Sequence, residues 1–245
     1  MARVCYSVQL HMSPSIPSRP RILLFDIDGT LLSADGAGRR ALSQAFRDVT
    51  GVEEALAAID FRGMTDRLIV EQALAQLAPI AATCEPEAIY ALYVKHLERE
   101  LAQSQGTRAL PGALELMNAL DWQSEAFAIG LGTGNLEPTA HLKLNRVGMA
   151  GLFSFGGFGS DHRLRSEILR IGALRGSRRL GRDPSECDTI VIGDTFHDVD
   201  AALAIGARAV CVATSGRSVD ELEARGAHYA FESLEDPRVF EVLTQ

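Results

Sequence analysis

Short apolar runs separated by longer amphipathic stretches dominate the pattern of this chain. Four apolar runs cover residues 22–25, 127–131, 190–192 and 209–212, and each is followed within two residues by Gly, Asp or Thr. A short apolar run closed by turn residues is typical of a strand that is buried on both faces of a sheet. The runs predict four such strands, and Tyr229 and Phe231 are candidates for one more.

Helical patterns lie between these runs. They cover residues 111–120, 138–147, 165–174 and 199–205. Short strands that alternate with helices are typical of repeated βαβ units. The sequence therefore predicts an α/β protein with a Rossmann-like parallel sheet.

Residues 34–105 carry helical stripes without a buried-strand pattern. Apolar residues recur at helical spacing in three groups: Ala41, Leu42, Ala45, Phe46 and Val49; Leu68, Ile69, Ala73, Leu74 and Leu77; and Ile89, Leu92, Tyr93 and Leu97. Such stripes predict faces along which helices pack. We expect a helical domain over residues 34–105, inserted into an α/β core domain that comprises residues 21–33 and 106–245.

The first 20 residues have no periodicity and include three prolines and four serines. This composition predicts an irregular, disordered leader. A signal peptide is not indicated, because no continuous apolar stretch of that type is present. Met12 is an alternative start, in which case residues 1–11 do not belong to the native protein.

Composition narrows the class of protein. The 245 residues are 47% hydrophobic and 23% charged, with a net charge of −8, which is typical of a soluble folded protein. No apolar run is long enough to span a membrane, and an acidic chain is a poor partner for nucleic acid. The four cysteines are far apart and form no CxxC pair, so we expect reduced thiols and a cytoplasmic location. The oligomeric state cannot be inferred.

Two carboxylates follow the first predicted strand directly. Asp26 and Asp28 stand two positions apart in the segment LLFDIDGTL, so both side chains leave the strand on the same side. In parallel α/β sheets, ligands bind at this carboxyl edge. Two adjacent negative charges are unfavourable unless a cation or a proton lies between them.

Two further strands bring polar groups to the same edge. Asp194 and Asp198 follow the run at 190–192, and Thr133 and Asn135 follow the run at 127–131. Carboxylate oxygens are the ligands that Mg²⁺ prefers, and a glycine-rich turn with a hydroxyl group suits a phosphate. The sequence therefore predicts a site for Mg²⁺ and phosphate.

These motifs resemble those of the haloacid dehalogenase-like (HAD) superfamily, in its phosphoglycolate-phosphatase-like branch with a helical cap. The first motif is Asp26-Ile27-Asp28-Gly29-Thr30, the second is Thr133, and the fourth is Gly193-Asp194 followed by Asp198. The resemblance covers about residues 21–235. It implies the HAD fold, with residues 34–105 as the cap domain, and a Mg²⁺-dependent phosphatase that acts on a small phosphorylated metabolite.

The resemblance also implies roles for single residues. Asp26 becomes the nucleophile that forms an aspartyl phosphate, and Asp28 becomes the general acid and base. Mg²⁺ is bound by Asp26, by the backbone carbonyl of Asp28 and by Asp194. Asp198 supports the site without binding the ion directly, or acts through a water bound to the metal. Thr133 donates to a phosphate oxygen. We expect Gly134, Asn135 and Thr65 to contact substrate, although a role of Thr65 as the cap of a helix already explains that residue and is the interpretation we favour for it.

One motif departs from the family pattern. The third motif is usually a lysine, but Lys143 follows Thr133 too closely and Lys95 falls in the helical insertion. We assign this role to Arg165, with Arg163 as the second candidate, because an arginine is always charged and binds phosphate in a fork.

Two alternatives to a phosphatase remain open at this point. A phosphosugar mutase-type phosphotransferase would use the same site residues. A non-catalytic HAD-fold binding protein would be consistent with the missing lysine.

Overall fold

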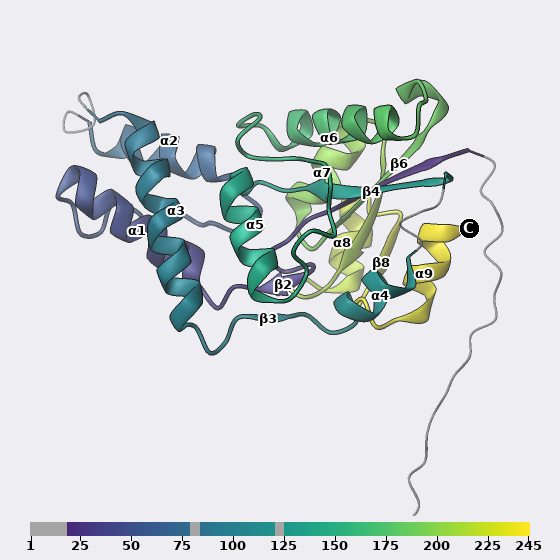
Figure 1. Ribbon diagram of the computed structural model, residues 1–245, viewed down its shortest axis with the longest axis horizontal. Coiled ribbons are helices and arrows are strands. Elements are labelled where there is room, and N and C mark those ends of the chain that lie inside the picture. Colours follow the sequence, from purple (N-terminus) through teal and green to yellow (C-terminus); the bar gives the residue numbers. More distant parts are fainter. Residues whose placement is uncertain (1–18, 79–83, 121–124) are drawn as a thin grey trace, which may run out of the picture.

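A computed structural model describes residues 19–78, 84–120 and 125–245, so most of the predicted leader lies outside the described residues. Its central feature is a six-stranded parallel sheet with the order β5-β4-β1-β6-β7-β8 (Figure 1). The strands are β1 (Arg21–Phe25), β4 (Phe127–Gly132), β5 (Gly156–Gly157), β6 (Asp188–Gly193), β7 (Arg208–Val212) and β8 (Tyr229–Phe231). The predicted α/β class and its parallel sheet are confirmed.

Helices cover both faces of this sheet because its strands are apolar on both sides. Leu23 and Phe25 of β1 pack into one buried cluster, together with residues of the helices α4 and α9, whereas Ile22 and Leu24 pack into another with α6, α7 and α8. The helices are α4 (Ala113–Ala119), α5 (Glu137–Arg146), α6 (Arg165–Arg179), α7 (Phe196–Ala204), α8 (Val219–Arg225) and α9 (Pro237–Thr244). A short 3₁₀ helix, η2 (Pro184–Glu186), precedes β6.

The segment between β1 and β4 contributes three helices that lie together beside the sheet (Figure 1). They are α1 (Ala37–Thr50), α2 (Asp66–Gln76) and α3 (Pro86–Gln103). The predicted apolar stripes are buried or partly buried here, with Phe46 and Leu97 fully enclosed. Because α1 and α3 pack along each other, the stripes serve helix packing. The exact division into core and cap domains remains a prediction.

A small antiparallel sheet joins this helical insertion to the rest of the chain. β2 (Leu32–Ser33) pairs with β3 (Arg108–Ala109), so the chain leaves and returns at one point. Strands of two residues are too short to show a periodic pattern, and the sequence did not indicate them. In the described part of the chain, no helix is long and apolar enough to cross a membrane.

Candidate active site

The three central strands of the sheet bring the predicted residues together. β1 lies between β4 and β6. Asp26 directly follows β1, Thr133 directly follows β4, and Asp194 directly follows β6. Since the strands are parallel, their carboxyl ends meet at one edge. The backbone N–H of Asp26 donates to the carbonyl of Ile192 in β6, which fixes the end of β1 against its neighbour.

A buried cluster of three carboxylates forms at this edge. Asp26, Asp194 and Asp198 each offer an oxygen within 4.8 Å of the others. Asp194 is held by two hydroxyl groups, since Thr30 Oγ1 donates to its Oδ1 at 2.9 Å and Ser215 Oγ donates to its Oδ2. The carboxylates are therefore fixed before any ligand is bound.

The turn after β1 fits closely against Asp194. Gly29 has φ +82°, a conformation that L side chains rarely adopt, and a Cβ here would lie 2.3 Å from Asp194 Oδ2. Only glycine can therefore occupy position 29 without displacing the carboxylate of Asp194.

Asp198 faces the cluster from the start of α7. Its Oδ2 accepts hydrogen bonds from the backbone of Thr195 at 3.0 Å and from Thr195 Oγ1 at 2.7 Å, which closes the first turn of the helix. Its Oδ1 lies 2.6 Å from Arg165. With both oxygens engaged, Asp198 supports the cluster in the manner expected of it, although its role remains a prediction.

Arg165, and not Arg163, is the arginine at this site. Arg165 is buried at the start of α6, and its guanidinium lies 2.6 Å from both Asp26 Oδ2 and Asp198 Oδ1. Arg163 is exposed and pairs instead with Glu71 of the helical insertion. Burial opposes the charge of Arg165, but Asp198 and Asp26 raise its pKa further above the ordinary value.

The acidic cluster carries more negative charge than Arg165 balances. Burial raises the pKa of Asp26 to about 6, against the opposing effect of Arg165. Burial, followed by the charges of Asp198 and Asp26, raises the pKa of Asp194 well above its usual range. A bound divalent cation would relieve this repulsion, and carboxylate oxygens are the donor set that Mg²⁺ prefers. The residues present therefore fit a magnesium ion.

Asp28 and the loop after β4 form a second group beside the cluster. Asn135 Nδ2 donates to Asp28 Oδ2 and to Thr133 Oγ1, both at 2.8 Å. Thr133 is fully buried, while the side chain of Asp28 is 42% exposed. The amide of Asn135 therefore serves mainly to connect these two residues.

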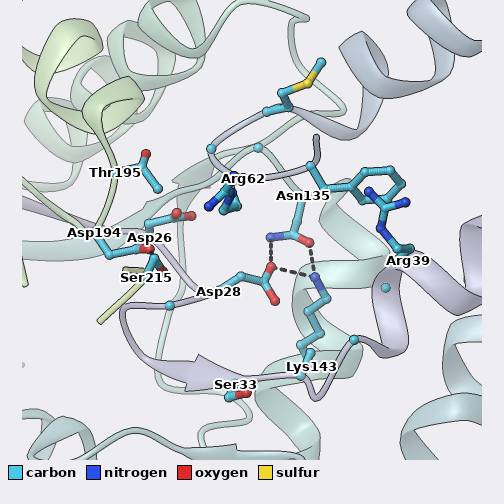
Figure 2. Close-up of a pocket in the computed structure, with 18 of the residues that line it drawn as sticks. Asp26, Asp28, Ser33, Arg39, Arg62, Asn135, Lys143, Asp194, Thr195 and Ser215 are labelled. Carbon is cyan, nitrogen blue, oxygen red and sulfur yellow. Dashed lines mark hydrogen bonds and ion pairs between the residues drawn. The ribbon is translucent and has the colours of Figure 1, made fainter. Parts of the chain in front are cut away.

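Lys143 is a site residue that the sequence analysis did not place here. It lies on α5 with its side chain 5% exposed, and its ammonium donates to Asp28 Oδ2 and Asn135 Oδ1 (Figure 2). A signal was present in the sequence, because Lys143 falls on the buried face of α5 with Ala140 and Leu144. Ser215 was also missed, although it follows β7 at the same edge of the sheet.

A loop of the helical insertion lies over the site. Gly63 has φ +68°, and a Cβ there would lie 2.5 Å from His197 Cδ2 and 2.7 Å from Thr195 Oγ1. Farther along, the backbone N–H of Asp66 donates to the carbonyl of Gly134, and Asp66 Oδ2 accepts from the N–H of Leu136. The insertion therefore closes over the carboxyl edge of the sheet.

Thr65 does not reach the cavity in the way a substrate-binding residue would. Its Oγ1 accepts from the backbone N–H of Leu68, which caps α2, and donates to the carbonyl of Arg163. The helix-capping interpretation therefore accounts for its hydroxyl group, and substrate contact by Thr65 finds no support in this arrangement.

A cavity of about 440 Å³ connects these groups. Asp26, Asp28, Gly134, Arg165 and Asp194 line it, together with Arg39, Phe61, Arg62 and Tyr93 of the insertion. Figure 2 shows Asp28, Arg39 and Arg62 around this space. This volume suits a small molecule, and the polar lining suits a charged one.

The fold and the site together define a class of α/β protein in which carboxylates at the ends of parallel strands lie beneath a helical insertion. The sequence profile of the haloacid dehalogenase-like hydrolases matches residues 20–206, and the chain belongs to this family.

Two curated proteins are similar to the chain over most of its length. Hexitol phosphatase A of Escherichia coli (strain K12) is 31% identical over 191 residues, which are 77% of this chain and 81% of that protein. Probable phosphatase IndB of Dickeya dadantii (strain 3937) is 27% identical over 207 residues, covering 83% and 85% of the two chains. They confirm the predicted family and support the predicted phosphatase class.

Solved structures share the fold at low sequence identity. CbbY from Rhodobacter sphaeroides in complex with phosphate matches with a TM-score of 0.64 at 18% identity, covering 89% of this chain and 96% of that one. A protein from Haemophilus somnus, described as a predicted phosphoglycolate phosphatase, matches with a TM-score of 0.62 at 16% identity, covering 93% and 99%. These likenesses confirm the HAD fold.

Proposed function

We propose that the protein is a Mg²⁺-dependent phosphatase that hydrolyses a small phosphorylated metabolite through an aspartyl phosphate on Asp26. The observation that carries this proposal is the buried cluster of Asp26, Asp194 and Asp198, beside Asp28. Three carboxylates are held together in a low-dielectric site, where a divalent cation would complete the charge balance and allow a phosphate to approach.

In the first step, a carboxylate oxygen of Asp26 attacks phosphorus and the bond to the leaving oxygen breaks. Asp28 gives a proton to that oxygen. In the second step, Asp28 takes a proton from water as the water attacks the aspartyl phosphate, which regenerates Asp26 and releases phosphate. Arg165 holds the carboxylate of Asp26 in place, and Thr133 donates to a phosphate oxygen.

Asp26, Asp194 and the backbone carbonyl of Asp28 would hold the magnesium ion. When bound, Mg²⁺ offsets the negative charge of the phosphate, so that a carboxylate nucleophile can approach it. Arg165, at 2.6 Å from Asp26, offsets part of the negative charge of the nucleophile itself.

The cavity limits the substrate to a small molecule. Its volume of about 440 Å³ and its arginine and carboxylate lining favour a short, polar phosphomonoester of the phosphoglycolate or sugar-alcohol kind. The loop around Gly63 covers the site, which would exclude bulk water during transfer.

A screen of small phosphomonoesters tests this proposal. Purified protein is incubated with 2-phosphoglycolate, alditol phosphates and sugar phosphates in MgCl₂, and inorganic phosphate is measured. We expect release for at least one compound, and none with EDTA or with Asp26→Asn. Isomerisation of a sugar phosphate without phosphate release would favour a mutase, and no turnover of any compound would favour a binding protein.

A further inference from the structure

Lys143 is buried in the candidate site and is not part of the motifs that define the family. Its side chain is 5% exposed, and it is one of only two lysines in the chain, the other being the exposed Lys95 on α3. Burying an ammonium group costs free energy unless it is paired and hydrogen-bonded. Both of its partners in the structure, Asp28 and Asn135, belong to the candidate site.

The three side chains form a closed triangle (Figure 2). Lys143 Nζ lies 2.6 Å from Asp28 Oδ2 and 2.5 Å from Asn135 Oδ1, and Asn135 Nδ2 lies 2.8 Å from the same Asp28 oxygen. The amide of Asn135 is thereby fixed in one orientation, because its oxygen faces a donor and its nitrogen faces an acceptor.

Both contacts to Asp28 fall on one oxygen atom. Oδ2 accepts from Lys143 and from Asn135, which leaves Oδ1 for a ligand in the cavity that Asp28 lines. Asn135 also connects the triangle to Thr133, because the amide nitrogen of Asn135 donates to the hydroxyl oxygen of Thr133. A single buried cation therefore sets the position of the carboxylate relative to the threonine that is expected to bind phosphate.

Lys143 lines the cavity along with Gly38 and Tyr93 of the insertion, and its ammonium is already paired with a carboxylate. A Cβ at Gly38 of α1 would lie 3.6 Å from Lys143 Nζ and 3.4 Å from the hydroxyl of Tyr93, so the ammonium is enclosed by the insertion. Its charge also acts on Asp66, where it opposes the effect of burial. The carboxylates of Asp28 and Asp66 therefore balance the positive charge of Lys143.

We propose that Lys143 is a positioning residue that holds the carboxylate of Asp28 in place for proton transfer to the leaving oxygen. This inference rests on the proposed function, in which Asp28 is the general acid. The hydrogen bonds of Lys143 are with Asp28 and Asn135, so we expect its removal to affect the proton-transfer step more than the binding of substrate.

The leaving group of the substrate provides the test. p-Nitrophenolate is a stable anion and leaves without being protonated. Phenolate, from phenyl phosphate, is a poorer leaving group and depends much more on a proton from the general acid. We expect Lys143→Met to raise the ratio of kcat/KM for p-nitrophenyl phosphate to that for phenyl phosphate by about tenfold or more. The KM values stay near those of the wild type, and Lys143→Arg returns the ratio toward the wild-type value.

A ratio of two substrates on one preparation is independent of how much of the variant is folded. The matched control is Lys95→Met, the same substitution at an exposed lysine, which leaves the ratio unchanged. An unchanged ratio in Lys143→Met, or a raised KM at unchanged kcat, would overturn the proposal. A wild type that hydrolyses neither these two compounds nor any phosphomonoester of the screen in MgCl₂ refutes the proposed function itself, and with it this role of Lys143.

The ion pair can also be measured without turnover. In protein labelled with ¹⁵N-lysine, two ammonium signals are expected, and Lys95→Met assigns the one that belongs to Lys143. We expect Asp28→Asn to shift this signal and to accelerate its hydrogen exchange. A Lys143 signal that does not respond to Asp28→Asn contradicts the contact on which the proposal is built.

Discussion

At the scale of single residues, a buried arginine lies between two carboxylates of the candidate site, and we assign to it the role that a lysine usually has in the third motif. Arg165 lies between Asp26 and Asp198, at 2.6 Å from each, and has almost no exposed surface. Its guanidinium group has a fixed fork of donors, which can engage two carboxylates at once where an ammonium group acts as a point charge. The geometry therefore explains why arginine suits this position.

Removal of Arg165 has consequences for both activity and stability. Arg165→Ala leaves Asp26 and Asp198 facing each other without a cation. We expect kcat for p-nitrophenyl phosphate to fall by at least about 100-fold, and the free energy of unfolding to fall by about 3–5 kcal/mol. Arg165→Lys retains part of both.

The control for this prediction is Arg163→Ala, which removes an exposed arginine two positions away. It should change neither quantity appreciably, because exposed ion pairs contribute little. Wild-type activity in Arg165→Ala would show that the third-motif role belongs elsewhere.

Residue-level predictions from the sequence succeeded where a residue follows a strand directly. Asp26, Asp28, Thr133 and Asp194 could be placed together because alternation and parallel strand ends leave few alternatives. Lys143 could not be placed in this way, because a lysine on a helix is expected to face water. Its spacing with Ala140 and Leu144 indicates a shared helix face, but its partner Asp28 is a tertiary contact that the pattern along α5 does not contain.

At the scale of elements, the loop before α2 lines the cavity of the candidate site. Gly63 has a positive φ, and a Cβ there would collide with Thr195 and His197. We expect Gly63→Ala to displace this loop and to lower kcat/KM by about tenfold or more. Steady-state kinetics with p-nitrophenyl phosphate would measure the effect.

Gly51→Ala is the matched control for the loop. Gly51 ends α1 with φ +74°, but a Cβ there meets nothing within 4 Å. Both variants should lose about 1 kcal/mol of stability through backbone strain, and only Gly63→Ala should lose activity. Equal activity in the two variants would contradict a covering role for the loop.

Asp66 links α2 to α5 and makes this contact pH-dependent. Its Oδ2 accepts from the N–H of Leu136 and from Thr139, and burial raises its pKa from 3.8 to about 6. The folded protein therefore holds a proton that the unfolded chain releases between these values. The stability contributed by the protonated group is lost as pH rises through this window.

Urea unfolding of the wild type and Asp66→Asn between pH 4 and pH 8 measures this linkage. We expect the wild type to lose about 1–3 kcal/mol relative to the variant between pH 4 and pH 6. The difference should be constant above pH 7. A difference that does not depend on pH in this range would show that the pKa of Asp66 is not raised by folding.

The longer elements could be predicted from the sequence, while the shortest ones could not. Helices α1, α2 and α3 carry apolar stripes over several turns, so their existence followed from periodicity alone. β5 (Gly156–Gly157) has two glycines and no side-chain pattern. It exists because β4 offers it an edge, and such pairing is decided by tertiary structure.

At the scale of the whole molecule, the strand order explains the site. β1, β4 and β6 are neighbours in the middle of the sheet, although about 60 to 100 residues separate each from the next along the chain. The helical insertion follows β1 and folds back over the same edge, where Asp66 contacts the loop that carries Gly134. The same chain topology therefore brings the carboxylates to one edge of the sheet and the helical insertion over that edge.

The central claim is that Asp26 takes the phosphoryl group, and acid-quench labelling tests it most directly. Wild-type protein is mixed with p-nitrophenyl [³²P]phosphate and MgCl₂, quenched in acid during turnover, and digested. We expect the label on the peptide that contains Asp26, and no label on Asp26→Asn. Label at another position, or turnover by Asp26→Asn at the wild-type rate, would contradict the account.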